Sequence, residues 1–493
     1  MTRLEKLTHA DADWEGLRVV VAGLGVSGFA AADALMQRGA RVVAVDARDG
    51  EVEQEKAAVL RLLDVDVRLG ADTDSLPDVE GSAPDVVVTS PGWRPDAPLL
   101  VAAQSSGVDV WGEVELAWRL RPATGAAPWL TLTGTNGKTT AVRMLAAILA
   151  AAGMRTAAVG NVGTPLLHAI VDPVPYDVLA VELSSFQLHW SASIAPRASA
   201  CLNVAPDHVD WHGSLDAYTA AKAKVYARTE VACVYNAEDL ATEQMVREAD
   251  VVDGCRAIGF TLGVPGLSML GVVDDVLCDR AFVAERATSA AELATVADLQ
   301  QAGGGTVAAH TVANALAAAA LARAHGVPPV AVRDGLRGVV PEPHRIARVA
   351  DHGGTTWVDD SKATNPHAAS ASLAAFDPVV WVAGGLAKGA SFDDLVATHA
   401  WRLRAVVLVG VDRSPLRDAL ARHAPDVPVV EVSPPDTGAV MRSAVSAAAD
   451  LARPGDTVLL APACASMDQF TSYATRGDAF ADAVRAHVSG LAG

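Results

Sequence analysis

Short apolar runs and longer amphipathic stretches alternate along nearly the whole chain. The runs are rich in valine and leucine and predict buried strands, whereas the stretches between them carry apolar residues at helical spacing. Buried strands separated by helices are typical of parallel, doubly wound sheets that helices cover on both faces. The pattern therefore predicts an α/β fold, with strands at residues 18–22, 41–45, 85–89, 129–133, 178–182, 198–204, 355–359, 379–383, 405–409 and 457–460.

Two breaks in this pattern divide the chain into three blocks. Residues 121–128 contain two prolines and a glycine and are expected to form a linker, and prolines at 341 and 343 mark the second break. The central block ends with an alanine-rich helix at about residues 310–325, whereas residues 263–305 show no pattern from which elements can be placed. We expect three domains, namely a Rossmann-like N-terminal domain at 1–121, a P-loop ATPase-like central domain at 122–341 and a Rossmann-like C-terminal domain at 342–493.

Composition narrows the class of protein. Of 493 residues, 51% are hydrophobic, which excludes a largely disordered chain. The formal net charge of −19 argues against general nucleic-acid binding and favours a soluble, acidic protein. No apolar run reaches the about 18 residues of a membrane span, the N-terminus has no signal-peptide pattern, and the five cysteines form no Cys-x-x-Cys pair. We therefore expect a reduced, cytoplasmic protein.

Lysine is rare in this chain and marks candidate sites. Only seven lysines occur, and arginine fills the other basic positions. Such a chain is expected to keep lysine where the planar fork of arginine cannot serve. Four of the seven, Lys138, Lys222, Lys362 and Lys388, lie in motif-like segments, although chance retention is the alternative at each.

The strongest motif is a glycine loop at residues 134–140, between a predicted strand and an apolar helix. Loop N–H groups and a helix N-terminus hold phosphate oxygens, Lys138 adds a positive charge, and a threonine hydroxyl can reach Mg²⁺. Only Thr135 and Asn136 separate the first glycine from the Gly-Lys pair, so the loop is shorter than the standard one. The surrounding strand and helix disfavour the alternative of a glycine turn without a ligand.

A second glycine-rich turn, at residues 23–28, follows the first strand, and Asp46 ends the second strand. This spacing fits a dinucleotide fingerprint and makes NAD the candidate ligand from the residues alone. The same turn serves any nucleotide phosphate, so a nucleotide or nucleotide-sugar is equally compatible. A turn that is needed only for its geometry is the remaining alternative.

Polar residues gather where other strands of the central block end. Glu182 ends a strand, and a carboxylate beside a phosphate loop can hold Mg²⁺. Asp207 and His208 follow the next strand and suit a metal or a phosphate, and Lys222 lies on the helix after them. The alternatives are a solvated strand-end glutamate, a surface turn and a solvated helix lysine.

The third block carries three polar clusters, at residues 359–365, 384–388 and 461–470, and each follows a predicted strand. In doubly wound sheets the carboxyl ends of the strands form one rim, where ligands bind. Lys362 and Lys388 at this rim favour a carboxylate or phosphate ligand.

Together these segments resemble the Mur ligase family from about Val19 to Arg476. The shortened glycine loop is the form that this family has. Asp360-Ser361-Lys362-Ala363-Thr364, together with residues 466–470 and Arg476-Gly477, is similar to the branch that adds D-glutamate. The other segments that carry the resemblance are residues 160–163, 182–185, 207–208, 220–222, His310 with Asn314, and 344–345.

The resemblance implies an ATP-dependent ligase in a cytoplasmic step of peptidoglycan precursor synthesis. In this family the substrate carboxylate attacks the γ-phosphate of ATP, which gives an acyl phosphate and ADP. The amine of D-glutamate then attacks the acyl carbon, and phosphate leaves. The implied partners are UDP-N-acetylmuramoyl-L-alanine, D-glutamate and ATP with Mg²⁺ at two sites. A monomer is expected, without nucleic-acid or membrane partners.

The resemblance also implies a role for each matching residue. Lys138, His208 and Lys222 would be catalytic, and Lys222 would be N6-carboxylated by CO₂. ATP would contact Gly134, Thr135, Asn136, Gly137, Lys138, Thr139, Thr140, Asn314, Arg345 and Asp360, and Mg²⁺ would contact Thr139 or Thr140, Glu182, His208 and Lys222. The UDP substrate would contact Gly25, Val26, Ser27, Gly28, Asp46, Asn161 and His208, and D-glutamate would contact Lys362, Thr364, Lys388, Ser466 and Tyr473.

Two positions depart from the family pattern. Ala47 follows Asp46 where the family often has threonine, and Tyr473 stands where phenylalanine is common.

Two other classes of protein remain as alternatives. An NAD-dependent oxidoreductase with a regulatory nucleotide domain would explain the turn at 23–28 but not the lysines of the third block. A non-catalytic nucleotide-binding partner of cell-wall assembly would not need Lys138, Glu182, His208 and Lys222 together.

Overall fold

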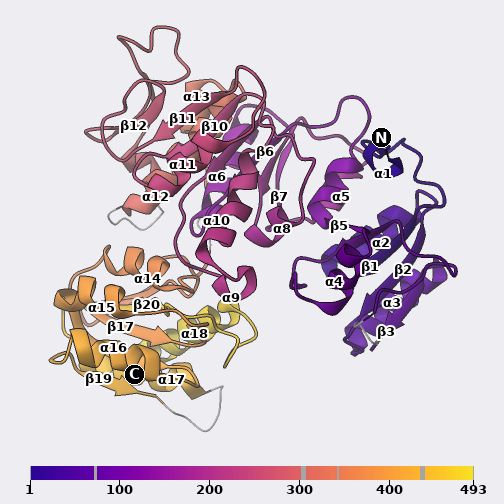
Figure 1. Ribbon diagram of the computed structural model, residues 1–493. Helices are drawn as coiled ribbons and strands as arrows, with labels where there is room; N and C mark the ends of the chain where they lie inside the picture. The colour runs from indigo at the N-terminus through magenta and orange to yellow at the C-terminus, as the bar shows by residue number, and fades with distance from the viewer. Residues whose placement is uncertain (1, 71–74, 301–306, 341–342, 433–438, 492–493) are drawn as a thin grey trace. The chain divides into compact units, whose positions relative to one another are not determined.

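The computed structural model describes residues 2–70, 75–300, 307–340, 343–432 and 439–491. The described chain contains sheets of five, nine and six strands (Figure 1). It forms two compact units, one of residues Met1–Leu299 with Thr311–Val339 and one of residues Gln300–His310 with Val340–Gly493. The first two sheets belong to the first unit, and the third sheet belongs to the second. No described helix is both long enough and apolar enough to cross a membrane.

The first sheet has the order β3-β2-β1-β4-β5, and all its strands are parallel. Every residue of β4 is buried and β1 is buried after its first residue, as expected for interior strands of a sheet with helices on both faces. The chain order reverses between β1 and β4, and loops beside such a switch point form the binding crevice of doubly wound folds. The strands are β1 (Arg18–Ala22), β2 (Arg41–Asp46), β3 (Asp66–Leu69), β4 (Val86–Thr89) and β5 (Asp109–Gly112). The helices are α1 (Arg3–Lys6), α2 (Val26–Met36), α3 (Glu51–Leu62), α4 (Pro98–Ser105) and α5 (Glu113–Arg119).

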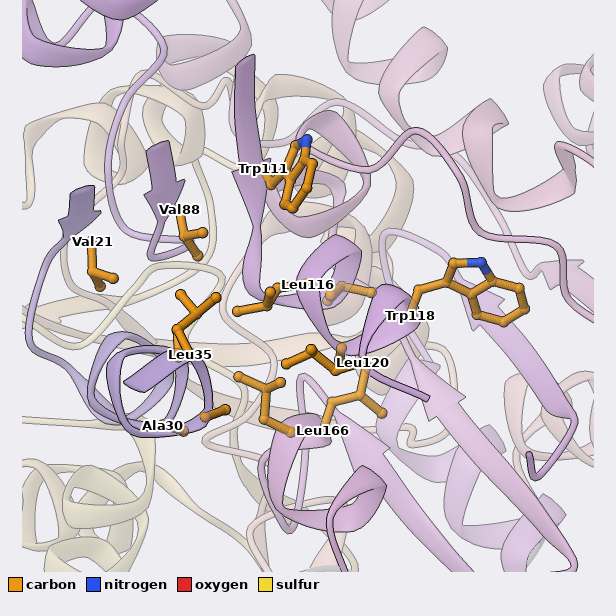
Figure 2. Close-up of a cluster of buried hydrophobic side chains, with 14 of the residues drawn as sticks. Val21, Ala30, Leu35, Val88, Trp111, Leu116, Trp118, Leu120 and Leu166 are labelled. Atoms are coloured by element: carbon orange, nitrogen blue, oxygen red, sulfur yellow. The ribbon is translucent and has the colours of Figure 1, made fainter. Parts of the chain in front are cut away.

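A continuous apolar core joins the first sheet to helices α2, α5 and α7 (Leu166–Ile170). Figure 2 shows Leu116 of α5, and Leu120 directly after α5, between the strands and Leu166 of α7. All three leucines are at most 1% exposed. Because α7 follows a strand of the second sheet, this buried contact ties the first sheet to the second within one unit.

The second sheet has the order β14-β13-β12-β11-β10-β9-β6-β8-β7. Strand β6 lies between β8 and β9, so the loop after β6 is flanked by the carboxyl ends of two parallel neighbours. The strands are β6 (Trp129–Thr133), β7 (Thr156–Gly160), β8 (Val178–Glu182), β9 (Ala198–Cys201), β10 (Ala232–Asn236), β11 (Arg256–Phe260), β12 (Met269–Val273), β13 (Val276–Asp279) and β14 (Ala291–Thr295). Besides α7, the helices of this part of the chain are α6 (Lys138–Ala151), α8 (Ser185–His189), α9 (Val209–His212), α10 (Leu215–Ala223), α11 (Leu240–Glu248), α12 (Ala309–Ala324) and α13 (Pro329–Arg337).

The third sheet has the order β15-β16-β20-β17-β18-β19. Strands β16, β20, β17, β18 and β19 are parallel, so the carboxyl ends of β16, β20 and β17 lie next to one another. The strands are β15 (Ala347–His352), β16 (Thr355–Asp359), β17 (Val379–Gly384), β18 (Leu403–Val409), β19 (Val429–Glu431) and β20 (Thr457–Leu460). The helices are α14 (Pro366–Leu373), α15 (Asp393–His399), α16 (Ser414–His423), α17 (Val440–Leu451) and α18 (Tyr473–Leu491).

Every strand predicted from the apolar runs is present, with ends shifted by a few residues at most. The prediction of parallel sheets is wrong at one edge of the second and third sheets, where β12, β13 and β14 and the pair β15–β16 run antiparallel. Two-residue turns explain the β12–β13 and β15–β16 pairs, whereas the 11 residues 280–290 separate β13 from β14. Val273 pairs with Val276 across a turn with Asp274 at φ 55, and His352 pairs with Thr355 across Gly353-Gly354, at φ 60 and 83. Positive φ values suit the tight turns of hairpins, which leave no room for a crossover helix.

Candidate active site

The loop at residues 134–140 joins β6 to α6 in a conformation that requires glycine at one point. Gly137 has φ 83, and a Cβ atom there would lie 2.3 Å from Oδ1 of Asn314. Asn314, on α12, therefore packs directly against the loop. The N–H groups of Lys138, Thr139 and Thr140 form the first turn of α6, where helical N–H groups have no intrahelical acceptor. This turn can bind phosphate oxygens.

The segment after β9 holds the glycine loop in place. The backbone N–H of Thr135 donates to Asn203 O at 3.0 Å, and the N–H of Asn136 donates to Asn203 Oδ1 at 2.9 Å. The Thr135 hydroxyl lies 3.1 Å from Ala205 O and 2.9 Å from the Tyr218 hydroxyl. These contacts fix the loop without using the N–H groups of the first turn of α6.

Two lysines donate to the same carbonyl of the loop. Lys138 Nζ lies 2.9 Å from Gly134 O and 2.9 Å from Thr135 O, and Lys222 Nζ lies 2.8 Å from Gly134 O. Lys222 is 1% exposed. Burial, followed by the charge of Lys138, lowers the pKa of Lys222 to about 7. The structure therefore places the buried Lys222 amine beside the glycine loop.

Tyr218 is part of this arrangement and was not assigned a role from the sequence. It is 1% exposed, its hydroxyl contacts Thr135, and its ring centroid lies 4.6 Å from Lys222 Nζ. Tyr218 and Lys222 are four residues apart on α10, a spacing that puts two side chains on one helix face. That spacing was the signal in the sequence that could have identified it.

Glu182 ends β8 beside the loop and offers an unused oxygen. It is 0% exposed, and its Oε1 accepts a hydrogen bond from Asn161 Nδ2 at 2.9 Å. Its Oε2 atom and the buried Oγ1 of Thr140 have no hydrogen-bond partner. Carboxylate and hydroxyl oxygens are the ligands that Mg²⁺ prefers, so this donor set fits the predicted metal. No cluster of three His, Cys, Asp or Glu side chains suited to a metal occurs among the described residues.

His208 lies at the start of α9, after the β9 segment that holds the loop. Its backbone is left-handed, at φ 52, and its Nε2 lies 3.6 Å from Oδ2 of Asp207. The ring of Phe186, from α8, lies 4.7 Å from the His208 ring. His212, one helical turn later, has its Nε2 3.0 Å from the Ser185 hydroxyl. Aromatic packing thus fixes the orientation of the predicted metal-binding and substrate-binding histidine.

The predicted UDP site of the first sheet is shaped by its glycines. A Cβ atom at Gly28 would lie 1.7 Å from Gly23 O, so the turn can close only with glycine at residue 28. A Cβ atom at Gly25 would meet nothing within 4 Å, and Val26 is 64% exposed. The surface at Gly25 and Val26 is therefore open to a ligand, whereas the Ser27 hydroxyl donates to Glu113 Oε2 at 3.1 Å.

The Asp46 carboxylate stabilises the same turn by hydrogen bonds. Its Oδ2 accepts from the Leu24 N–H at 2.8 Å, and Arg48 donates to Asp46 through Nε at 3.2 Å. Burial opposes charge on Asp46, but Arg48 and the backbone N–H groups outweigh it and lower the pKa of this carboxyl. Lys56 Nζ donates to Leu24 O at 3.0 Å. Arg48 and Lys56 were not singled out from the sequence as part of this turn.

The rim of the third sheet brings together the residues predicted for D-glutamate. The loops after β17 and β20 are joined by hydrogen bonds between Leu386 and Ala465, at 2.8 and 3.1 Å, which bring the segments with Lys388 and Ser466 side by side. Lys362 Nζ lies 5.2 Å from the centroid of the Tyr473 ring. Thr364 lies in the same turn as Lys362, because its N–H donates to Lys362 O at 2.9 Å.

Arg476 connects these loops and was missed as a site residue. It is 1% exposed and donates to Ser361 Oγ at 3.0 Å, Ser361 O at 2.9 Å and Cys464 O at 3.1 Å. Asp360 is also buried, accepts hydrogen bonds from Ser372 Oγ and from the Ile346 N–H, and has its pKa raised to about 6 by burial. The signal in the sequence was the resemblance of Arg476-Gly477 to the D-glutamate branch, which marked Arg476 without giving it a role.

The predicted site residues divide between the two units. The glycine loop, Asn161, Glu182, His208, Lys222 and Asn314 belong to the first unit, together with the turn at 23–28. Arg345, Asp360, Lys362, Thr364, Lys388, Ser466 and Tyr473 belong to the second.

Three family models match successive parts of the chain. The Mur ligase MurD-like N-terminal domain matches residues 17–112, the Mur ligase middle domain matches 132–322, and the Mur ligase glutamate ligase domain matches 344–464. Each sheet therefore carries one of the three domains of this family.

Curated relatives cover nearly the whole chain. UDP-N-acetylmuramoylalanine--D-glutamate ligase of Streptomyces avermitilis is 61% identical over 96% of this chain and 99% of its own length. The protein of the same name from Thermobifida fusca is 58% identical over 96% of this chain and 98% of its own length.

Solved structures share the fold at low identity. UDP-N-acetylmuramate-alanine ligase of Thermotoga maritima has a TM-score of 0.53 and 18% identity, and covers 95% of this chain and 99% of its own. Crystal structure I of MurF from Acinetobacter baumannii has a TM-score of 0.55 and 16% identity, and covers 96% of this chain and 91% of its own.

Proposed function

The chain belongs to the Mur ligase family, and we propose that it catalyses the ATP-dependent addition of D-glutamate to UDP-N-acetylmuramoyl-L-alanine. The product is a precursor of peptidoglycan. The observation that carries this proposal is the pair of lysines on Gly134 O, next to the unused carboxylate oxygen of Glu182. Relatives that are named for this reaction and share more than half of their residues with the chain support the substrates.

Phosphoryl transfer is the first step of the proposed reaction. The first turn of α6 and Lys138 hold the β- and γ-phosphates of ATP, and Asn314 supports the loop from α12. The carboxylate of the nucleotide-sugar substrate attacks the γ-phosphorus, and ADP leaves. Such transfer depends on positioning and on neutralising negative charge more than on covalent help from the protein.

Mg²⁺ would supply charge neutralisation at the phosphates when bound. Thr139 or Thr140, Glu182, His208 and a carboxylated Lys222 are the proposed ligands of two ions. The unpartnered oxygens of Glu182 and Thr140 support the first of these sites. The histidine ring, held by Phe186, supports the second.

Carboxylation of Lys222 resolves a conflict in the site. Two ammonium groups on one carbonyl repel each other, and a pKa of about 7 leaves much of Lys222 as the free amine that CO₂ requires. Addition of CO₂ to the neutral amine forms an N–C bond and releases one proton. The resulting carbamate is an anion beside Lys138, so repulsion becomes attraction.

The remaining roles follow the position of each residue in its sheet. Gly25, Val26, Ser27, Gly28 and Asp46 form the proposed UDP site, and the turn serves UDP rather than NAD. Asn161 and His208 are proposed to contact the muramoyl part of the substrate. Arg345 and Asp360 are proposed to contact ATP, and Lys362, Thr364, Lys388, Ser466 and Tyr473 are proposed to bind D-glutamate.

The proposal includes the organisation of the whole chain. Residues 1–121, 122–341 and 342–493 are the UDP-substrate, ATP and amino-acid domains. The enzyme acts as a monomer in the cytoplasm and has no nucleic-acid or membrane partner.

Phosphate release tests the proposed reaction directly. Purified protein is given ATP, Mg²⁺, UDP-N-acetylmuramoyl-L-alanine and D-glutamate, and each component is omitted in turn. Sustained phosphate release is expected only with all four, because the acyl phosphate needs both substrates to form and to be consumed. Replacing D-glutamate with L-alanine or diaminopimelate should remove turnover, and equal turnover with either would contradict the D-glutamate assignment.

A further inference from the structure

Two of the five cysteines face each other in the second sheet, away from the candidate active site. Cys233 lies on β10, and Cys255 directly precedes β11, the parallel neighbour of β10. Their sulfur atoms are 3.8 Å apart. A disulfide bond has a length of about 2.05 Å, so the two sulfurs must move closer together for a bridge to form.

We propose that Cys233 and Cys255 form a reversible dithiol–disulfide pair, which hydroperoxides oxidise to an intrachain bridge between β10 and the start of β11. The cysteine spacing does not reveal this pair, because 21 residues separate the two positions. Only the pairing of β10 with β11 brings them together.

The two thiols differ in exposure and in the direction of their pKa shifts. Cys255 is half-buried, whereas Cys233 is 2% exposed. A hydrogen bond with the Cys233 thiol, aided by backbone N–H groups, lowers the pKa of Cys255, while the same hydrogen bond and burial raise that of Cys233. Cys255 is therefore the cysteine that an oxidant reaches first, since it is the more exposed of the two and its pKa is lowered, and Cys233 is the thiol that resolves the product.

The chemistry balances with hydrogen peroxide as the oxidant. The Cys255 thiolate attacks one peroxide oxygen, the O–O bond breaks, and hydroxide leaves, which gives a sulfenic acid. The Cys233 sulfur then attacks the sulfenic sulfur, a second hydroxide leaves, and the two sulfurs are joined. Two thiols lose two electrons and two protons in total, and one peroxide becomes two waters. A dithiol reductant reverses the reaction by exchange.

The position of the bridge predicts its effect. Cys233 is the second residue of β10, and Cys255 precedes the first residue of β11, so both lie at the amino ends of their strands. The glycine loop follows the carboxyl end of β6 in the same parallel array. Oxidation should therefore leave catalysis nearly unchanged. It should stabilise β10 and β11 against unfolding, because a bridge limits the conformational freedom of the unfolded chain.

Peptide mapping tests the pair in the intact protein. Trypsin separates Cys233, in residues 229–247, from Cys255, in residues 248–256. After stoichiometric hydrogen peroxide, alkylation and digestion without reductant, we expect these two peptides to be linked, and to separate on reduction. We expect the linkage to form at least tenfold faster in native protein than in urea, and the Tm to rise by a few degrees.

Cys278 provides the matched control, because it is also half-buried but donates to Val276 O at 3.6 Å instead of facing a thiol. Cys278→Ser should leave the linkage intact, whereas Cys255→Ser should abolish it. Cys255 is not fully buried, so this variant keeps the test valid if Cys233→Ser fails to fold. Equal oxidation of Cys255 and Cys278 without linkage would overturn the proposal, and so would linkage as fast in urea as in native protein. Because oxidation is read from peptides, either result is independent of ligase activity.

Discussion

The carbonyl oxygen of Gly134 accepts hydrogen bonds from two lysine side chains, those of Lys138 and Lys222. Lys138 lies folded back onto the loop, with Nζ at 2.9 Å from both Gly134 O and Thr135 O. Neutral carbonyls are weaker partners for an ammonium than phosphate oxygens are. The β- and γ-phosphates of ATP are therefore expected to draw Lys138 off the carbonyls, which leaves Gly134 O to Lys222.

Replacing Lys138 should remove most of the activity and little of the stability. Lys138→Ala deletes a charge that neutralises the transferred phosphoryl group, and such a loss costs about 3 kcal/mol or roughly a hundredfold in kcat. The measurement is steady-state phosphate release, with a thermal melt to confirm folding. Lys6→Ala, at an exposed residue of α1, is the control and should leave turnover nearly unchanged. Near-normal turnover of Lys138→Ala would remove this lysine from the mechanism.

Replacing Lys222 distinguishes a carbamate from a plain cation. Lys222→Arg keeps a positive charge but cannot form a stable carbamate, so activity should fall sharply. Lys222→Ala should also be inactive, and a small carboxylic acid should restore part of the activity by supplying the missing anion. Lys224 lies two residues later, with its Nζ 2.6 Å from His189 O, and Lys224→Arg should be nearly silent. Full activity of Lys222→Arg without added acid would contradict the carbamate.

The sequence identified the charged residues of the site but not the polar residues that hold them. Lys138, Lys222, Lys362 and Lys388 stand out because lysine is rare in this chain. Tyr218 and Arg476 received no role from the sequence, because their contacts come from burial and from partners distant in sequence. No local pattern encodes a partner more than a hundred residues away, such as Ser361 for Arg476.

At the scale of secondary-structure elements, helix α5 connects the first sheet to the second through one buried carboxylate. Glu115 is 0% exposed and accepts from Ala192 N at 2.8 Å, Ser193 N at 2.9 Å, Ser193 Oγ at 2.6 Å and Arg119 Nε at 2.7 Å. Ala192 and Ser193 follow α8 in the second sheet's part of the chain. Burial opposes its charge, but these donors outweigh burial and lower the pKa of Glu115.

Glu115→Gln should destabilise the protein at neutral pH and much less in acid. The amide keeps the shape but weakens charge-assisted hydrogen bonds, at a cost of about 2–4 kcal/mol in the free energy of unfolding. A carboxyl whose pKa is lowered by folding stabilises fully above its unfolded value, 4.5, and loses this contribution as pH falls through the folded pKa. Urea unfolding at pH 7 and below pH 4 measures the difference.

Glu55, an exposed residue of α3, gives the matched control, since Glu55→Gln should change the free energy of unfolding little at either pH. If Glu115→Gln were as stable as the parent chain at pH 7, the carboxylate would have no net role in joining the two sheets. A difference that did not shrink in acid would show that geometry rather than charge is lost.

Strands that form continuous apolar runs were predictable from the sequence, whereas the short antiparallel strands and hairpins were not. Strand β6 and strand β8 match the predicted residues 129–133 and 178–182, because buried parallel strands are continuous apolar runs. Residues 269–295 form three short antiparallel strands with mixed burial, so neither a period of two nor one of 3.6 is evident. The hairpins depend on the φ values of Asp274 and of Gly353-Gly354, which apolar patterning does not report.

At the scale of the whole molecule, the chain crosses between its two compact units three times, after residues 299, 310 and 339. The sequence places a break at prolines 341 and 343, and residues 341–342 lie outside the described part of the chain. The order of the three blocks was readable from the sequence because each has its own apolar runs. The contact of Asn314, on α12, with the glycine loop was not readable from the sequence, because it joins positions 177 residues apart, from 137 to 314.

We predict that the two units move relative to each other during turnover. The acyl phosphate forms at the glycine loop of the first unit, and the attacking amine is held by residues proposed in the second. We predict that a non-hydrolysable ATP analogue together with the nucleotide-sugar reduces the radius of gyration measured by small-angle scattering, because bound ligands favour the state that assembles both sets of residues. The analogue with Lys138→Ala protein is the control, since weakened phosphate binding should leave a smaller change. Identical profiles with and without both ligands would mean that the units keep one arrangement, and that D-glutamate reaches the acyl phosphate without domain closure.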